Sequence, residues 1–349
     1  MKRLIISMSV ITLVMLSLVS CRNKKSGTDL LTPASSGRPY EVTVIMADSL
    51  WNRPAGRAVF AALDTDVPGL PQSERSFFIY HMDVQNYDQI TRLSRNLILV
   101  DINPNLYTQT KFKYQRDVYS SPQMIMTIQS PDENELTAYV NTHRNAIVEF
   151  FTLAEMNREV EFLKQHHNRN LSDKVKEMFN CEMNIPEELR SFKVGKDFVW
   201  ASTNKGTADM NFVMYSYPYT SNKTFTKEYF IAKRDSFMKA NIPGAKPNMH
   251  MATDSEFVDV KNIMVKKNYA MEARGLWEME HDMMGGPFVS HSSVDTVNNR
   301  VIVVEGFVYA PDTKKRDLMR KMEASLYTLQ LPAGPKKVPG MKAASKKTK

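Results

Sequence analysis

The sequence contains little cysteine and lacks the short motifs that identify the common enzyme classes. Two cysteines among 349 residues exclude a disulfide framework. No GxSxG or GxxxxGK[ST] motif occurs, so the signatures of acyl transfer and nucleotide hydrolysis are missing. No HExxH motif or CxxC pair is present to bind a metal. We therefore predict no catalytic residue, no metal site and no cofactor, and the sequence favours binding over catalysis.

No apolar run is long enough to span a bilayer as a helix, but a short one opens the chain. Residues 4–19 carry no charge, follow Lys2 and Arg3, and number 16 where a span needs about 20. A positive start, an apolar stretch and a small residue before the cut are the parts of a secretory signal peptide. The ending Leu-Val-Ser-Cys at Cys21 resembles a bacterial lipobox. This resemblance implies that Cys21 is lipidated and carries diacylglycerol and a palmitate-like acyl chain; an incidental cysteine behind an ordinary signal is the alternative.

The residues that follow Cys21 bear on which membrane holds the protein. In Gram-negative lipoproteins an Asp directly after the cysteine commonly marks retention in the inner membrane, and Arg22 stands there instead. Acidic residues just after the cysteine, which tend to mark export to the cell surface, are also absent. We therefore predict an outer-membrane lipoprotein that faces the periplasm.

The positive net charge of +8 comes from the ends of the chain. Residues 38–335 hold 35 cations and 37 acids, whereas residues 336–349 hold six lysines and no acid. A near-neutral body without a basic stripe, in a secreted protein, argues against nucleic-acid binding. The lysine-rich tail is interpreted either as a solvated extension or as a contact with anionic envelope surfaces.

Strand and helix patterns predict an α+β fold: antiparallel sheets with helices packed on one side. A unit of two strands, a proline and a helix recurs, with Pro131, Pro218 and Pro311 at the boundary. The first unit has strands at 116–121 and 123–129. This recurrence suggests two related α+β halves, although ordinary punctuation of α+β chains gives the same pattern. The predicted divisions are a signal peptide (1–20), a lipidated cysteine with a flexible tether (21–37), an N-terminal α+β unit with long helices (38–180), a C-terminal α+β unit (181–332) and a disordered lysine-rich tail (333–349).

The sharpest loop signal is Gly285-Gly286-Pro287, close to Trp277. Two glycines allow positive φ angles and a close approach of backbone or ligand. The pattern is explained either by a tight turn that leads into a strand or by a binding loop beside Trp277. Methionines nearby, at 279, 283 and 284, fill cores or line an adaptable apolar groove. Such a groove motivates the alternative function, a lipid or ligand carrier.

Other reactive side chains give weak signals. His281 and His291 lie near several carboxylates, but their spacing matches no metal motif. Cys181 is expected to be a buried apolar group. An envelope hydrolase is the least favoured function, with carboxylates Asp48, Asp64 and Asp66 as its candidates.

Several short motifs occur in order along the chain and resemble one family. That family is an uncharacterised group of Gram-negative lipoproteins catalogued as a domain of unknown function, and the resemblance covers about residues 38–330. It implies a lipid anchor and a common fold, and no activity. We therefore expect a binding or scaffold protein of the envelope, with an unknown protein partner. The motifs are Cys21, Asp48-Ser49-Leu50-Trp51, Gly69-Leu70-Pro71-Gln72, Arg95-Asn96, Gly275-Leu276-Trp277 and Met284-Gly285-Gly286-Pro287-Phe288.

Overall fold

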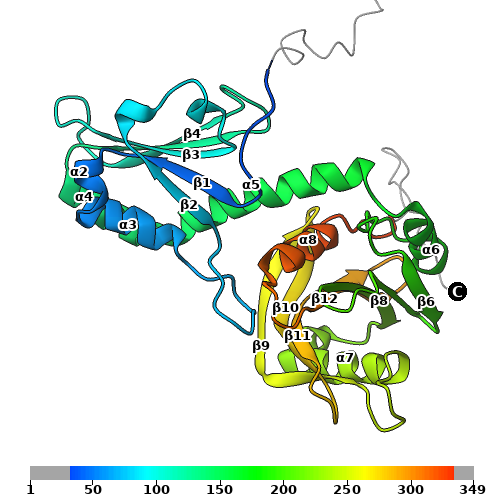
Figure 1. The fold of residues 1–349 in the computed structure, drawn as a ribbon. Helices are drawn as coiled ribbons and strands as arrows, with labels where there is room; N and C mark the ends of the chain where they lie inside the picture. The colour runs from blue at the N-terminus through cyan, green and yellow to red at the C-terminus, as the bar shows by residue number, and fades with distance from the viewer. Residues whose placement is uncertain (1–31, 334–349) are drawn as a thin grey trace, which may run out of the picture. The chain divides into compact units, whose positions relative to one another are not determined.

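The computed structural model describes residues 32–333 and divides them into two units (Figure 1). The first unit comprises residues 32–57 and 79–139, and the second comprises 58–78 and 140–333. Each unit contains one β-sheet and helices, so the predicted α+β class and the two halves are confirmed. The boundary predicted after residue 180 stays a prediction; along the chain the compact units change over after residues 57, 78 and 139.

The first unit has a mixed five-stranded sheet in the order β2-β1-β3-β5-β4. Neighbours β1 and β3 are parallel, as are β3 and β5, and only β4 runs antiparallel to β5. A wholly antiparallel sheet was expected. The difference arises because the chain crosses back to the same end of the sheet before β3 and again before β5. The strands are β1 (Glu41–Ile45), β2 (Phe78–Met82), β3 (Asn96–Ile102), β4 (Lys111–Arg116) and β5 (Met124–Ser130).

The two faces of this sheet are covered differently. On one face Phe112 of β4 meets Tyr139 of α4 edge to face, with ring centroids 5.0 Å apart. On the other face Ile45, Leu97 and Ile125 form a small buried cluster, against which Tyr87 packs. One short 3-10 helix lies before Tyr87 in the chain and another lies after it. The remaining elements of this part of the chain are α2 (Asp48–Trp51), α3 (Pro54–Leu63, which crosses the division), η1 (Val84–Asn86), η2 (Thr91–Leu93) and α4 (Glu133–Thr142).

The second unit has a seven-stranded sheet in which each strand is antiparallel to its neighbours. Its central strands are buried along nearly their whole length because both faces of the sheet are covered. β8, for example, is buried at eight consecutive positions. In spatial order the strands are β6 (Ser191–Gly195), β7 (Phe198–Ser202), β8 (Asp209–Pro218), β12 (Arg300–Tyr309), β11 (Gly285–Asp295), β10 (Asn268–Met279) and β9 (Met251–Val265).

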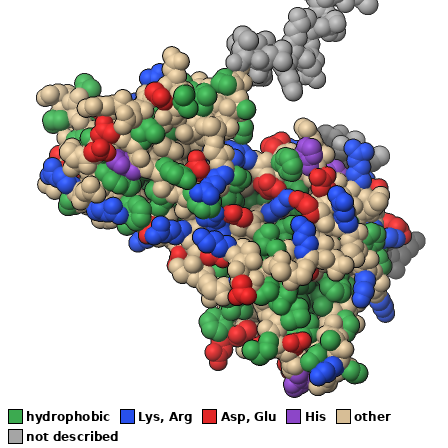
Figure 2. Space-filling view, viewed as in Figure 1, with side chains coloured by type: hydrophobic (Ala, Val, Ile, Leu, Met, Phe, Trp, Pro, Cys, Tyr) green, Lys and Arg blue, Asp and Glu red, His purple; other side chains and the backbone are tan. Residues whose placement is uncertain are grey.

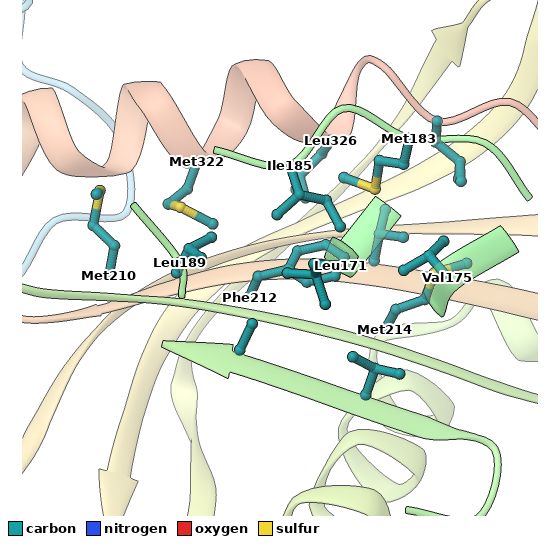
Figure 3. Packing of buried hydrophobic residues seen from close by; sticks show 14 of the residues in the cluster. Leu171, Val175, Met183, Ile185, Leu189, Met210, Phe212, Met214, Met322 and Leu326 are labelled. Carbon is teal, nitrogen blue, oxygen red and sulfur yellow. The ribbon is translucent and has the colours of Figure 1, made fainter. Parts of the chain in front are cut away.

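Helices cover both faces of this sheet, where one covered face was expected. Phe212 and Met214 of β8 point into a cluster with helices α6 and α8 (Figure 3). The alternate residues Val213 and Tyr215 belong to a second cluster with helix α7. Among residues 32–333 no helix has the length and apolar character to cross a bilayer. The helical elements of this unit are α5 (Arg144–Gln165), α6 (Arg169–Phe179), η3 (Asn222–Phe225), α7 (Lys227–Asn241) and α8 (Arg316–Leu326).

The three predicted strand pairs all form antiparallel hairpins: β4–β5, β7–β8 and β11–β12. The strand predicted at 116–121 instead occupies 111–116, and residues 117–121 form the turn. The second and third hairpins lie in the same sheet, and the helices that follow them cover opposite faces.

The turn between β9 and β10 places two lysines in a strained conformation. Lys266 and Lys267 form a two-residue loop, since Val265 pairs directly with Asn268. Their φ angles are 45° and 71°. Two-residue hairpin turns with positive φ normally use Asn-Gly or Gly-Gly, because a Cβ atom disfavours this region. Lys266 is held in place by its Nζ, which donates to the carbonyl oxygen of Thr328 at 2.6 Å.

We predict that Lys267→Gly raises the free energy of unfolding of the second unit by about 0.5–1 kcal/mol. Glycine removes the strain of the left-handed conformation, and this gain exceeds the added entropy of the unfolded chain. Urea unfolding measures the change. Lys267→Ala is the matched control, because it removes the same charge but keeps the Cβ atom. An equal gain from both variants would contradict the prediction.

Candidate functional site

The structure brings Trp277, Gly285 and Gly286 together inside the sheet. Trp277 pairs with Gly286 across β10 and β11, and its indole is 2% exposed. Its Nε1 donates to the carbonyl oxygen of Val308 at 3.2 Å. A Cβ atom on Gly286 would lie 2.1 Å from that same oxygen, so the position requires glycine. Pro287 continues the strand opposite Leu276. Close backbone packing thus accounts for the motif, while the binding hypothesis for these residues stays a prediction.

The methionines near Trp277 do not line one surface. Met279 is buried and Met284 is partly buried in the cluster around Trp277, whereas Met283 is 99% exposed in the turn. A surface hollow of about 400 Å³ lies elsewhere in this unit and is mostly polar. It therefore differs from the apolar groove that a carrier needs. Its lining residues are Asn168, Asn170, Glu187, Arg190 and Phe192.

The two histidines considered as metal ligands lie in different surroundings. His281 is exposed in the turn between β10 and β11, whereas His291 is buried in β11 and pairs with Glu272. Among residues 32–333 no group of three or more His, Cys, Asp or Glu side chains could hold a metal ion. Cys181 is fully buried as expected, and burial raises the pKa of its thiol to about 12. It is therefore not a reactive thiolate at neutral pH. Cys21 and the lysine-rich tail lie outside the described residues.

A buried ionic network joins the sheet of the second unit to helix α8. The carboxylate of Glu272 lies 2.6 Å from Nε of Arg274 and 3.4 Å from Nε2 of His291. Arg274 also forms an ion pair with Glu323 on α8. Nη1 of Arg320 lies 3.2 Å from the other carboxylate oxygen of Glu323. Burial opposes ionisation of Glu272, but the hydrogen bond from His291 and the charge of Arg274 outweigh it and hold the pKa of this carboxyl well below its usual range.

A second buried ion pair joins the opposite face to helix α7. Arg234 of α7 and Glu305 of β12 are both fully buried, and Nη2 of Arg234 lies 2.8 Å from Oε1 of Glu305. The guanidinium also lies 4.2 Å from the ring centroid of Phe288 and donates to Oγ1 of Thr253 at 2.9 Å. These charged groups are paired with one another in the protein interior, so we assign both networks a structural role. Sequence reasoning missed them because Arg234 and Glu305 are 71 residues apart.

Exposed chemistry gathers instead where the parallel strands of the first unit end. We call the side chains of Asp48, Trp51, Arg57, His81 and Asp83 the carboxyl-end site. In sheets with parallel strands, ligands commonly bind beyond the carboxyl ends of the strands. The site forms because β1 ends at Ile45 and leads directly into the short helix α2, while β2 lies beside β1.

The imidazole of His81 is the centre of the carboxyl-end site. Its ring stacks on Trp51 with centroids 4.3 Å apart and planes 3° from parallel. Its Nε2 lies 2.9 Å from the carbonyl oxygen of Met46, which can only accept, so Nε2 carries a hydrogen. Its Nδ1 lies 3.7 Å from a carboxylate oxygen of Asp48. The hydrogen bond to Met46 and the stack on Trp51 therefore fix the orientation of the ring, and its Nδ1 faces Asp48 without a direct hydrogen bond.

Charged groups surround this stacked pair. The guanidinium of Arg57 lies 5.7 Å from the ring centroid of Trp51. Asp83 accepts hydrogen bonds from the backbone N–H groups of Gln85 and Asp48, both at 2.8 Å, and these bonds lower the pKa of its carboxyl. The result is a partly exposed aromatic stack flanked by a cation and two carboxylates.

The three acids considered for hydrolysis are held by separate partners. Asp48 faces His81 in the first unit. In the second unit, Asp64 pairs with Nε of Arg75 at 2.5 Å, and Asp66 accepts from Ser73 at 2.8 Å. The sequence singled out Asp48 and Trp51 within a motif, but it gave no signal that His81 joins them.

We predict that Glu272→Gln lowers the free energy of unfolding of the second unit by about 3 kcal/mol at pH 7, because it leaves buried cations without their counter-charge. The folded-state pKa of Glu272 is depressed, so this stabilisation is present above its ordinary value of 4.5 and fades as the pH falls below it. Urea unfolding at pH 7 and pH 3.5 should show a smaller difference at the lower pH. Glu256→Gln on the exposed part of β9 is the control, and a pH-independent difference for Glu272→Gln would contradict the prediction.

Comparison with known proteins gives two family matches. Residues 35–164 match a domain of unknown function (DUF8532), and residues 168–328 match another domain of unknown function (DUF4837). No curated protein matches the chain.

Two solved structures show limited likeness. A crystal structure from Bacteroides thetaiotaomicron VPI-5482 aligns at 13% identity with a TM-score of 0.20, over 44% of this chain and 45% of that chain, less than half its length. The human StarD13 (DLC2) lipid transfer and protein localization domain aligns at 6% identity with a TM-score of 0.17, over 46% of this chain and 95% of that one. Scores this low carry no argument about fold or function. The family matches confirm the expected likeness to an uncharacterised family: both parts of the chain match domains of unknown function, DUF8532 first and DUF4837 second.

Proposed function

We propose that this protein is a lipoprotein anchored through Cys21 in the outer membrane, on its periplasmic face, and that it binds or scaffolds a partner of the cell envelope. The observation that carries the binding role is the His81–Trp51 stack at the carboxyl-end site. The hydrogen bond from Nε2 of His81 to Met46 and the stack on Trp51 hold this aromatic group in one orientation, which suits a binding surface.

The charges in the second unit support the same proposal. Arg234 with Glu305, and Glu272 with Arg274, are closed ion pairs with almost no exposure. Buried pairs of this kind fix packing and do not meet a substrate. The buried charges of the second unit are therefore structural, and the partly exposed aromatic stack of the first unit, with the charged groups beside it, offers the better binding surface.

The anchoring part of the proposal predicts a specific loss on changing one cysteine. Cys21→Ser removes the thiol that would be acylated, so incorporation of labelled palmitate should fall to background and the protein should leave the membrane fraction. Multiple acyl chains are needed for stable anchoring, at about 0.8 kcal/mol per buried CH₂. Cys181→Ser is the matched control and should keep both label and location. Incorporation of labelled palmitate that persists in Cys21→Ser would contradict the proposed anchor.

The binding part predicts that Trp51→Ala weakens capture of a partner at least tenfold. Removing the indole deletes the aromatic surface and leaves His81 without its stacking partner. The test is affinity isolation of the full lipoprotein from native membranes, with quantitative mass spectrometry of proteins and lipids. Tyr269→Ala, an exposed aromatic on β10, is the control.

The two variants separate the outcomes of this isolation. A protein partner lost with Trp51→Ala and kept with Tyr269→Ala supports the proposed site. A partner kept by both variants would exclude the carboxyl-end site, and recovery of a defined lipid alone would favour the carrier function instead.

A further inference from the structure

The described chain begins at the opposite edge of the first unit's sheet from the carboxyl-end site. Ala34 forms a bridge with Ser121, and Ser36 forms one with Ser94. The N–H of Ser36 donates to the carbonyl oxygen of Leu93 at 2.8 Å. Both partner segments directly precede the strands β3 and β5. The chain therefore leads toward Cys21 from the amino ends of the parallel strands.

The same edge holds four arginines, which we call the arginine edge: Arg38, Arg92, Arg95 and Arg116. The first precedes β1, the next two precede β3, and Arg116 ends β4 opposite Met124, the first residue of β5. The parallel register of β3 and β5 begins at Asn96 and Met124, so these positions share one end of the sheet.

Charge and aromatic character at this edge suit a membrane interface. Acids also lie at this edge: Glu41 is 3.6 Å from Arg38, and Asp117 is 3.2 Å from Arg116. Asp88 precedes Arg92 in the same loop. Arg38 and Arg116 are 52% and 77% exposed.

Beside them, the guanidinium of Arg92 lies 5.2 Å and 5.5 Å from the ring centroids of Tyr87 and Tyr119. Tyr119 and its neighbour Val118 are 37% and 42% exposed. Tyrosine and arginine side chains are favoured at the headgroup level of membranes, where phosphates attract the cation and the ring is partly desolvated.

The length of chain before the described residues limits how far this edge can lie from the anchor. Ten residues lie between Cys21 and Thr32, and the eleven steps from one Cα atom to the other span at most about 40 Å when fully extended. We propose that the arginine edge lies on anionic lipid headgroups of the membrane that holds Cys21, which directs the carboxyl-end site away from that membrane. This inference rests on the proposed lipid anchor.

The test measures the depth of each edge in the acylated full-length protein on vesicles. A bimane label is placed at Val118→Cys on the arginine edge or at Leu106→Cys beyond the carboxyl end of β3; Cys181 is buried and stays unlabelled. The vesicles contain 70% phosphatidylethanolamine and 30% phosphatidylglycerol, with a nitroxide on a fraction of the headgroups. We expect at least threefold stronger quenching at position 118 than at 106, and loss of this difference in vesicles of phosphatidylcholine.

Two pairs of charge reversals test the role of the arginines. Arg38→Glu with Arg116→Glu should reduce quenching at position 118 to a third or less. Lys111→Glu with Lys113→Glu is matched in charge and lies toward the other end of β4, so it should leave quenching at 118 unchanged. Equal quenching at 118 and 106, or equal effects of both reversals, would overturn the proposal, and the edge would then be assigned to an acidic protein partner.

Different results would contradict the proposed lipid anchor and the proposed membrane contact of the arginine edge. A protein without acyl chains by mass spectrometry contradicts the anchor alone. The edge is then measured on the same chain with a hexahistidine tag in place of Cys21, bound to nickel-chelating lipid. An acylated protein that floats with vesicles but shows no preferred quenching at position 118 contradicts the edge alone.

Discussion

The parallel pairing of β1, β3 and β5 determines what each end of the first unit's sheet presents. Parallel strands place all their amino ends on one edge and all their carboxyl ends on the other. Arg38 and Arg95 precede strands and therefore share one edge, whereas Asp48 and Trp51 follow a strand and lie at the opposite edge. An antiparallel sheet would have mixed these groups. A single rule of strand direction thus separates a cationic edge from the stacked aromatic site.

The second unit depends on a different constraint, the cost of leaving a charge buried without a partner. Each face of its sheet is joined to a helix by an internal ion pair: Arg234 of α7 with Glu305, and Arg274 with Glu323 of α8. A slip in helix packing would separate these charges in an apolar environment, at a cost of several kcal/mol. The apolar clusters supply most of the driving force for folding, and the ion pairs select one arrangement of helix on sheet. This arrangement gives the unit a single rigid packing.

Local patterns in the sequence predicted where most helices and strands lie, but seldom which strands pair or in which direction. The strands predicted at 197–202 and 300–309 form at 198–202 and 300–309, because their apolar residues lie in short runs between turns. The strand Lys111–Arg116 was misplaced because it is an edge strand, and the hydrophobic signal fails where most side chains face solvent. The parallel order could not be predicted, since it depends on partners far apart in the chain. Gly286 illustrates the same limit: two glycines before a proline fit either a loop or a close backbone contact, and only the neighbouring Val308 decides between them.

The net charge of the chain likewise does not reveal how charge is distributed over the surface of the folded protein. Summed over residues 38–335 the body is near neutral, which suggests a surface without electrostatic preference. The sum does not record where charges lie, because a pair such as Arg234 and Glu305 cancels in it wherever the pair is placed. The field at the surface depends on the positions of exposed charges: Figure 2 shows acidic and basic side chains mixed over the face in view, while the fold places Arg38 and Arg116 on one edge. A neutral total is therefore compatible with a protein whose opposite edges attract different partners, and strand direction, not composition, creates that difference.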